Sequence, residues 1–86
     1  MREKEVRDDG STLELVVWQL VHAVPGSPHG FKYSLYFGRN GQTLVRYDNE
    51  RGKGDHRHVG GRELPYQFRT LEALIEDFFA DVEGST

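Results

Sequence analysis

The chain has 86 residues, no cysteine and a formal net charge of −3. This length allows one domain, residues 1–86, with a small core, and the lack of cysteine excludes disulfides and thiolate metal ligands. No apolar stretch approaches the roughly 20 residues of a membrane span, and the charged N-terminus lacks the apolar region of a signal peptide. We therefore expect a cytoplasmic protein without a membrane partner.

The first strong pattern is a turn followed by a strand. The dipeptide Asp9-Gly10 suits a type I′ hairpin. After it, Leu13, Leu15 and Val17 alternate with polar residues, which predicts a strand with one buried face. Residues 16–21 are almost wholly apolar, and they predict burial of the second half of this strand on both faces.

Two more strands follow around a second hairpin. Residues 24–30 contain two prolines and two glycines and predict a loop. Large apolar side chains alternate along residues 31–37, as in a strand. The dipeptide Asn40-Gly41 is a strong hairpin signal, and it leads into a further alternating segment, residues 42–48.

The end of the chain predicts one helix. Residues 66–68 resemble a short edge strand, because Pro65 excludes a central position. Thr70 is a suitable N-cap, and the helix is expected to end near Gly84. Its apolar residues recur at helical spacing: Leu71, Leu74, Ile75, Phe78, Phe79 and Val82. The expected fold class is α+β, an antiparallel meander of about four to five strands covered by one C-terminal amphipathic helix.

Residues 47–58 form the segment with the most chemically active side chains. The sequence there is Y-D-N-E-R-G-K-G-D-H-R-H. Gly52 and Gly54 allow positive φ and a close approach of the backbone to a ligand. Few connecting loops need so many groups that transfer protons or bind anions, so we expect residues 47–58 to form a glycine-rich loop that is the functional site.

One interpretation of the segment is a metal site. His56 and His58 would point to the same side of an extended chain, and two imidazoles with Asp48 or Asp55 could begin a zinc or manganese site. However, no third histidine or cysteine stands at a familiar ligand spacing. A metal-dependent hydrolase therefore stays an alternative interpretation, although the sequence identifies no complete metal ligand set and no cofactor.

A second interpretation is acid–base chemistry on an RNA phosphodiester. Cleavage needs a base for the 2′-hydroxyl, an acid for the leaving oxygen and cations for the phosphate, and histidine can take either proton role near neutral pH. The expected catalytic residues are His56, His58, Asp55, Lys53 and Asp48. The expected substrate-binding residues are Arg51, Arg57, Asn49, Gly52, Gly54 and Tyr66.

Two further interpretations involve no catalysis. The segment could be a solvent-facing turn in which Asp48 and Asn49 bond their own backbone. It could also bind a nucleic acid or a protein, because residues 46–62 carry five basic side chains against three acidic ones. Residues 71–86 carry five acidic side chains and no basic one, which is a surface suited to a basic partner.

The sequence also resembles a known family. The motifs V-V-W, V-P-G-S-P-H-G-F-K-Y-S-L, Y-D-N-E-R-G-K-G-D-H-R-H and P-Y-Q-F-x-x-L-E-A-L-I-E-D-F are similar to those of the TumE-type toxins of type II toxin–antitoxin systems. The resemblance covers the chain from about residue 9 to residue 82. It implies a toxin that inhibits growth through RNA or the ribosome, with a cognate antitoxin carrying a helix-turn-helix as its partner.

Overall fold

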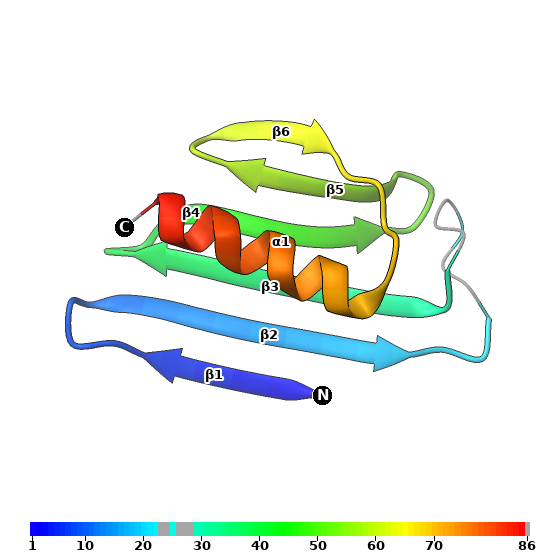
Figure 1. Ribbon diagram of the computed structural model, residues 1–86, viewed down its shortest axis with the longest axis horizontal. Coiled ribbons are helices and arrows are strands. Elements are labelled where there is room, and N and C mark those ends of the chain that lie inside the picture. The colour runs from blue at the N-terminus through cyan, green and yellow to red at the C-terminus, as the bar shows by residue number, and fades with distance from the viewer. Residues whose placement is uncertain (23–24, 26–28, 86) are drawn as a thin grey trace.

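The computed structural model describes residues 1–22, 25 and 29–85 and contains one antiparallel sheet and one helix (Figure 1). The six strands pair in chain order, so the sheet is a simple meander. The strands are β1 (Arg2–Val6), β2 (Ser11–Gln19), β3 (Phe31–Arg39), β4 (Gln42–Glu50), β5 (Gly54–Val59) and β6 (Arg62–Pro65), and the helix is α1 (Leu71–Gly84). The α+β prediction is confirmed, although the sheet has six strands rather than four to five.

The additional strands come from segments without a continuous apolar pattern. All five residues of β1 are exposed, and charged edge strands of this kind protect a sheet from pairing with other chains. The segment after Glu50 was expected to be an irregular loop, but it forms β5 and β6. Residues 66–68, expected to be an edge strand, lie beyond β6 and are not in a strand.

Glycine conformations set the turns between strands. Asn40 and Gly41 have φ of 55° and 76°, which confirms the hairpin between β3 and β4 as the type that needs positive φ twice. At the turn between β1 and β2 only Gly10 has positive φ, 85°, and its N–H donates to the carbonyl of Arg7. That turn is therefore a type I turn with a glycine bulge, not the expected type I′ turn.

The core lies between α1 and one face of the sheet. Leu13, Leu15 and Val17 are buried, as the alternation predicted. The fully buried large side chains include Tyr33, Phe37, Tyr47 and Phe78. The expectation for residues 16–21 is wrong, because Trp18 is 55% exposed and Val21 is 94% exposed. Only one face of β2 is covered, so its second half has no layer to bury it on the other face.

The helix begins and ends where the sequence indicated. The hydroxyl of Thr70 accepts a hydrogen bond from the backbone N–H of Ala73 at 3.0 Å, which is N-cap geometry. Leu74, Phe78 and Val82 are the buried side chains of the helix, spaced to lie on one stripe. The expected loop at residues 24–30 falls largely on residues outside the described part of the chain, since residues 24 and 26–28 are not described.

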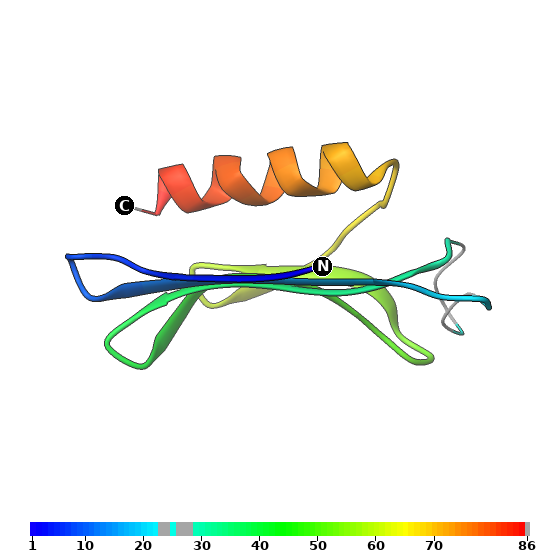
Figure 2. The same cartoon turned by 90° about the horizontal axis from the view of Figure 1, so that it is seen from below.

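The sheet has two unlike faces. Figure 2 shows α1 on one side of the sheet, the helix face, and no helix of the described residues on the other side, the open face. In β4 and β5 the helix face carries Tyr47, Asn49, Asp55 and Arg57, and the open face carries Arg46, Asp48, Glu50, His56 and His58. This division decides which residues can act together.

Candidate functional site

The predicted site segment is a β-hairpin. Residues 47–50 belong to β4 and residues 54–58 to β5, joined by a turn in which the N–H of Lys53 donates to the carbonyl of Glu50. Gly52 and Gly54 have φ of 81° and 78°, which explains glycine at both positions. Because side chains alternate along a strand, the hairpin sends the predicted residues to opposite faces of the sheet.

Asp55 lies on the helix face with His29. Its Oδ2 is 2.6 Å from Nε2 of His29 and accepts a hydrogen bond from the hydroxyl of Tyr33 at 2.7 Å. The ring of His29 stacks on Phe68 with centroids 3.8 Å apart. Burial and the bond to Asp55 raise the pKa of the Tyr33 hydroxyl well above its usual value. Asp55 therefore joins β5 to the chain entering β3 and lies apart from His56 and His58.

Asn49 is fully buried on the same face. Its side-chain oxygen accepts a hydrogen bond from the N–H of Tyr33 at 3.0 Å, and its amide nitrogen donates to the carbonyl of Phe31 at 2.7 Å. Lys32 donates to the backbone carbonyl of Asn49. These bonds hold β4 against the beginning of β3. Asn49 therefore has a structural role.

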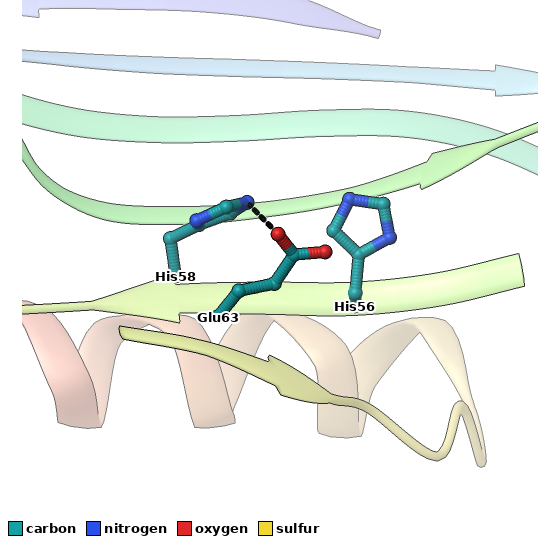
Figure 3. A group of neighbouring side chains, drawn as sticks. All are labelled: His56, His58 and Glu63. Atoms are coloured by element: carbon teal, nitrogen blue, oxygen red, sulfur yellow. Dashed lines mark ion pairs between the residues drawn. The ribbon is translucent and has the colours of Figure 1, made fainter. Parts of the chain in front are cut away.

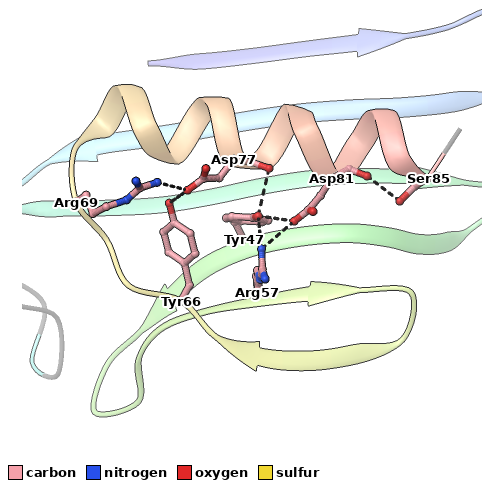
Figure 4. A network of polar contacts seen from close by, with 7 residues as sticks. All are labelled: Tyr47, Arg57, Tyr66, Arg69, Asp77, Asp81 and Ser85. Atoms are coloured by element: carbon pink, nitrogen blue, oxygen red, sulfur yellow. Dashed lines mark hydrogen bonds and ion pairs between the residues drawn. The ribbon is translucent and has the colours of Figure 1, made fainter.

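Arg57 and Tyr47 connect the sheet to the helix (Figure 4). Nη1 of Arg57 lies 3.2 Å from the hydroxyl oxygen of Tyr47 and 3.3 Å from Oδ2 of Asp81, and the Tyr47 hydroxyl donates to Asp81. Burial, followed by the bond to Asp81, raises the pKa of Tyr47. Arg57 thus pairs with the acidic helix.

Tyr66 makes the second connection to the helix (Figure 4). Its hydroxyl donates to Oδ2 of Asp77 at 2.7 Å, and Arg69 donates to the same oxygen at 2.7 Å. Burial and this bond raise the pKa of Tyr66 to about 12, while the hydroxyl of Tyr66 lowers the pKa of Asp77. The side chain of Tyr66 therefore lies on the helix face with Tyr47, whereas His56 and His58 lie on the open face.

On the open face, His56 lies beside Asp48. The two residues are cross-strand partners, and Nε2 of His56 is 2.8 Å from Oδ1 of Asp48 and 3.7 Å from Oε1 of Glu50. The side chains of His56 and Asp48 are only 9% and 8% exposed. Arg46 lies 3.2 Å from the other carboxylate oxygen of Asp48. The imidazole is therefore held among two carboxylates and one guanidinium.

His58 is the second histidine of the open face. Its ring centroid lies 5.7 Å from that of His56, and its Nε2 is 3.7 Å from Oε2 of Glu63 (Figure 3). The sequence did not predict Glu63 as a residue of the site. The glycines 60 and 61, with φ of 58° and 81°, make a two-residue turn that places Glu63 directly opposite His58.

Space for a ligand exists on both sides of these histidines. A pocket of about 500 Å³ is lined by Lys53, Asp55, His56, Glu63, Leu64 and Pro65. A second pocket, of about 250 Å³, is lined by Thr43, Arg46, His58 and Gly61. Each histidine thus borders its own pocket, and each pocket contains a basic side chain.

We name His56, His58, Asp48, Glu50 and Glu63 the open-face cluster. It can transfer protons, because it presents two imidazoles that each lie beside a carboxylate. It can also offer nitrogen and oxygen ligands to a metal ion: within each of the sets His56–His58–Glu63 and Asp48–Glu50–His56, the ligand atoms lie within 4.8 Å of one another. Lys53 and Arg51 are exposed at the turn beside the cluster.

Fold and cluster together define a small α+β protein with one covered sheet face and a polar, histidine-bearing open face. The family described as Toxin TumE matches residues 2–86, essentially the whole chain. The chain belongs to this family. Membership indicates a toxin of a toxin–antitoxin system, with a cognate antitoxin as its partner.

Comparisons with curated proteins and with solved structures identify no further relative. No curated protein and no solved structure matches the chain. In the described residues, no helix is both long enough and apolar enough to cross a membrane. The assignment of a working site therefore depends on the geometry of the chain itself.

Proposed function

We propose that this toxin acts on RNA in the cytoplasm and that the open-face cluster is its working site. The observation that carries the proposal is the position of His56, held 2.8 Å from Asp48 and on the same uncovered sheet face as His58. Two histidines on one uncovered sheet face, each bordering a pocket, supply the two proton transfers that cleavage by the 2′-hydroxyl requires.

The neighbouring residues fit this chemistry. The carboxylate of Asp48 beside His56 stabilises a protonated imidazole, which favours His56 as the base. His58 borders a separate pocket, from which it can protonate the leaving oxygen. Arg46, Arg51 and Lys53 supply positive charge near the cluster, and arginine offers a bidentate fork to phosphate. Asp55, Asn49, Arg57 and Tyr66 act in this proposal through the fold, by holding the hairpin to β3 and α1.

The antitoxin is proposed to be a protein with a helix-turn-helix, as the family resemblance implies. Residues 71–86 offer it five acidic side chains. Two of these, Asp77 and Asp81, are already paired with Arg69 and Arg57. Glu72 and Glu76 are exposed on α1 and are available to basic side chains of a partner.

The test is inducible expression of the intact chain and of the His56→Ala/His58→Ala variant, with growth and total RNA followed over time. The matched control is His22→Ala, because His22 is exposed and lies outside the cluster. We expect growth arrest and RNA loss with the parent and the control and neither with the double variant. Arrest and RNA loss that persist in a soluble double variant would rule out the histidine chemistry.

A second candidate function is RNA binding without cleavage. Trp18 favours it, because it is 55% exposed and its register places it on the same open face as Asp48. An exposed indole offers a stacking surface to an unpaired base, worth about 1–3 kcal/mol. Under this alternative Trp18→Ala weakens RNA binding, the histidine substitutions do not, and no cleavage product forms.

A further inference from the structure

We infer that His56, His58 and Glu63 form a binding site for a divalent transition-metal ion such as Zn²⁺, with the carboxylate of Asp48 beside His56. The inference concerns the same site as the proposed function and adds a ligand to it. Metal binding can be measured on the purified protein without RNA, so the two claims can fail separately.

The ligand types are those that zinc uses in proteins. Two imidazoles and one carboxylate make a His₂Glu set, which binds zinc and leaves one position open. Two adjacent strands bring the set together: β5 supplies both histidines, and the short turn at residues 60–61 brings Glu63 on β6 opposite His58. On the other side of β5, β4 places Asp48 opposite His56. Figure 3 shows the carboxylate of Glu63 between the rings of His58 and His56, with its ion pair to His58.

The distances between the ligand atoms are close to those found around a bound zinc ion. Tetrahedral ligands at about 2.1 Å from zinc lie about 3.4 Å from one another. Nε2 of His58 and Oε2 of Glu63 are 3.7 Å apart, and the three ligand atoms of the set lie within 4.8 Å of each other. Glu63 is exposed, so its carboxylate can move by this difference without disturbing the core.

Asp48 provides an independent observation. Its Oδ1 is buried and has no hydrogen-bond partner, although Nε2 of His56 is only 2.8 Å away. A buried carboxylate oxygen without a hydrogen bond is costly. A cation beside Asp48 would satisfy this oxygen.

Metal binding and proton transfer exclude each other at the same nitrogen. A coordinated imidazole nitrogen holds no proton and has no free lone pair. Zinc in the His56–His58–Glu63 site would therefore inhibit the proton-transfer chemistry proposed above. The site would make the toxin sensitive to the concentration of free zinc.

The experiment is calorimetric titration of Zn²⁺ into the intact chain, prepared without a histidine tag, and the same titration of three variants. We expect one ion per chain for the parent and for the control His22→Ala. We expect His58→Ala and Glu63→Gln to bind at least about 100-fold more weakly, because even loss of an outer-shell partner costs about 10- to 100-fold in affinity. Circular dichroism confirms that each variant is folded.

The outcomes separate the two claims. No stoichiometric binding by the folded parent, or equal affinity in Glu63→Gln and His22→Ala, overturns the metal site. Growth arrest by a protein that binds no zinc leaves the proposed function standing without the metal site. Zinc binding by a protein that causes neither arrest nor RNA loss leaves the metal site standing without the proposed function.

Discussion

Asp55 and His56 are neighbours in the chain, but their side chains make contacts on opposite faces of the sheet. Oδ2 of Asp55 lies 2.6 Å from Nε2 of His29 on the helix face, and Nε2 of His56 lies 2.8 Å from Oδ1 of Asp48 on the open face. One hairpin therefore sends neighbouring residues to the packed helix face and to the uncovered open face of the sheet.

The first prediction concerns Asp55. Replacement by Ala leaves His29 and the hydroxyl of Tyr33 without this partner in a buried place, since the side chains of His29 and Asp55 are 9% and 5% exposed. We expect the free energy of unfolding to fall by about 3 kcal/mol, as for other broken buried pairs, in urea denaturation.

The control for this prediction is Glu76→Gln, an exposed substitution on α1 that should change stability by less than about 0.5 kcal/mol. If Asp55→Ala were as stable as this control, the contact between Asp55 and His29 would not hold β5 to the chain that enters β3.

The second prediction concerns the pH dependence of the contact between Tyr66 and Asp77. The hydroxyl of Tyr66 lowers the pKa of Asp77 below its usual 3.8. A carboxyl group with a lowered folded-state pKa stabilises the protein above its usual pKa, and this stability is lost as pH falls through the folded pKa. Tyr66→Phe should cost about 1 kcal/mol at pH 7 and less at pH 3.

Urea denaturation of the parent and Tyr66→Phe at pH 7 and pH 3 measures this difference. NMR titration of Asp77 should show its pKa rising in the variant. An equal loss of stability at both pH values, with no rise in the pKa, would mean that the tyrosine acts only through packing.

The third prediction concerns metal addition and removal. If the histidines of the open-face cluster transfer protons, stoichiometric Zn²⁺ should reduce RNA cleavage by the purified protein, and a chelator should restore it. Mg²⁺ should have little effect by this route, because it prefers oxygen ligands. Loss of activity in chelator, restored by Zn²⁺, would instead identify a metal-dependent hydrolase.

Alternation and capping residues explain why much of the fold could be predicted. Leu13, Leu15 and Val17 alternate because one face of β2 is buried, and Thr70 precedes the apolar helical pattern that it caps. The charged strand β1 buries no side chain, so it leaves no periodic pattern. A sheet covered on one side can extend into such segments without any apolar signature.

The contacts of the site were harder to predict because they depend on register. The sequence predicts residues 47–58 as the functional site, but as one loop. In the structure most of them lie in strands, and a strand sends alternate residues to opposite faces. The pairing of His29 with Asp55 joins residues 26 positions apart, and no local pattern indicates it. Glu63 could have been found, since a Gly60-Gly61 hairpin places it opposite His58.

The measurement that tests the central claim most directly is the cleavage rate of a labelled RNA by purified parent, His58→Ala and His22→Ala proteins, each in chelator and each shown to be folded. Loss of one proton-transfer residue typically costs about 100-fold or more, so we predict such a loss for His58→Ala and an unchanged rate for His22→Ala. Equal rates in His58→Ala and the parent would contradict the assignment of the open-face cluster as the working site.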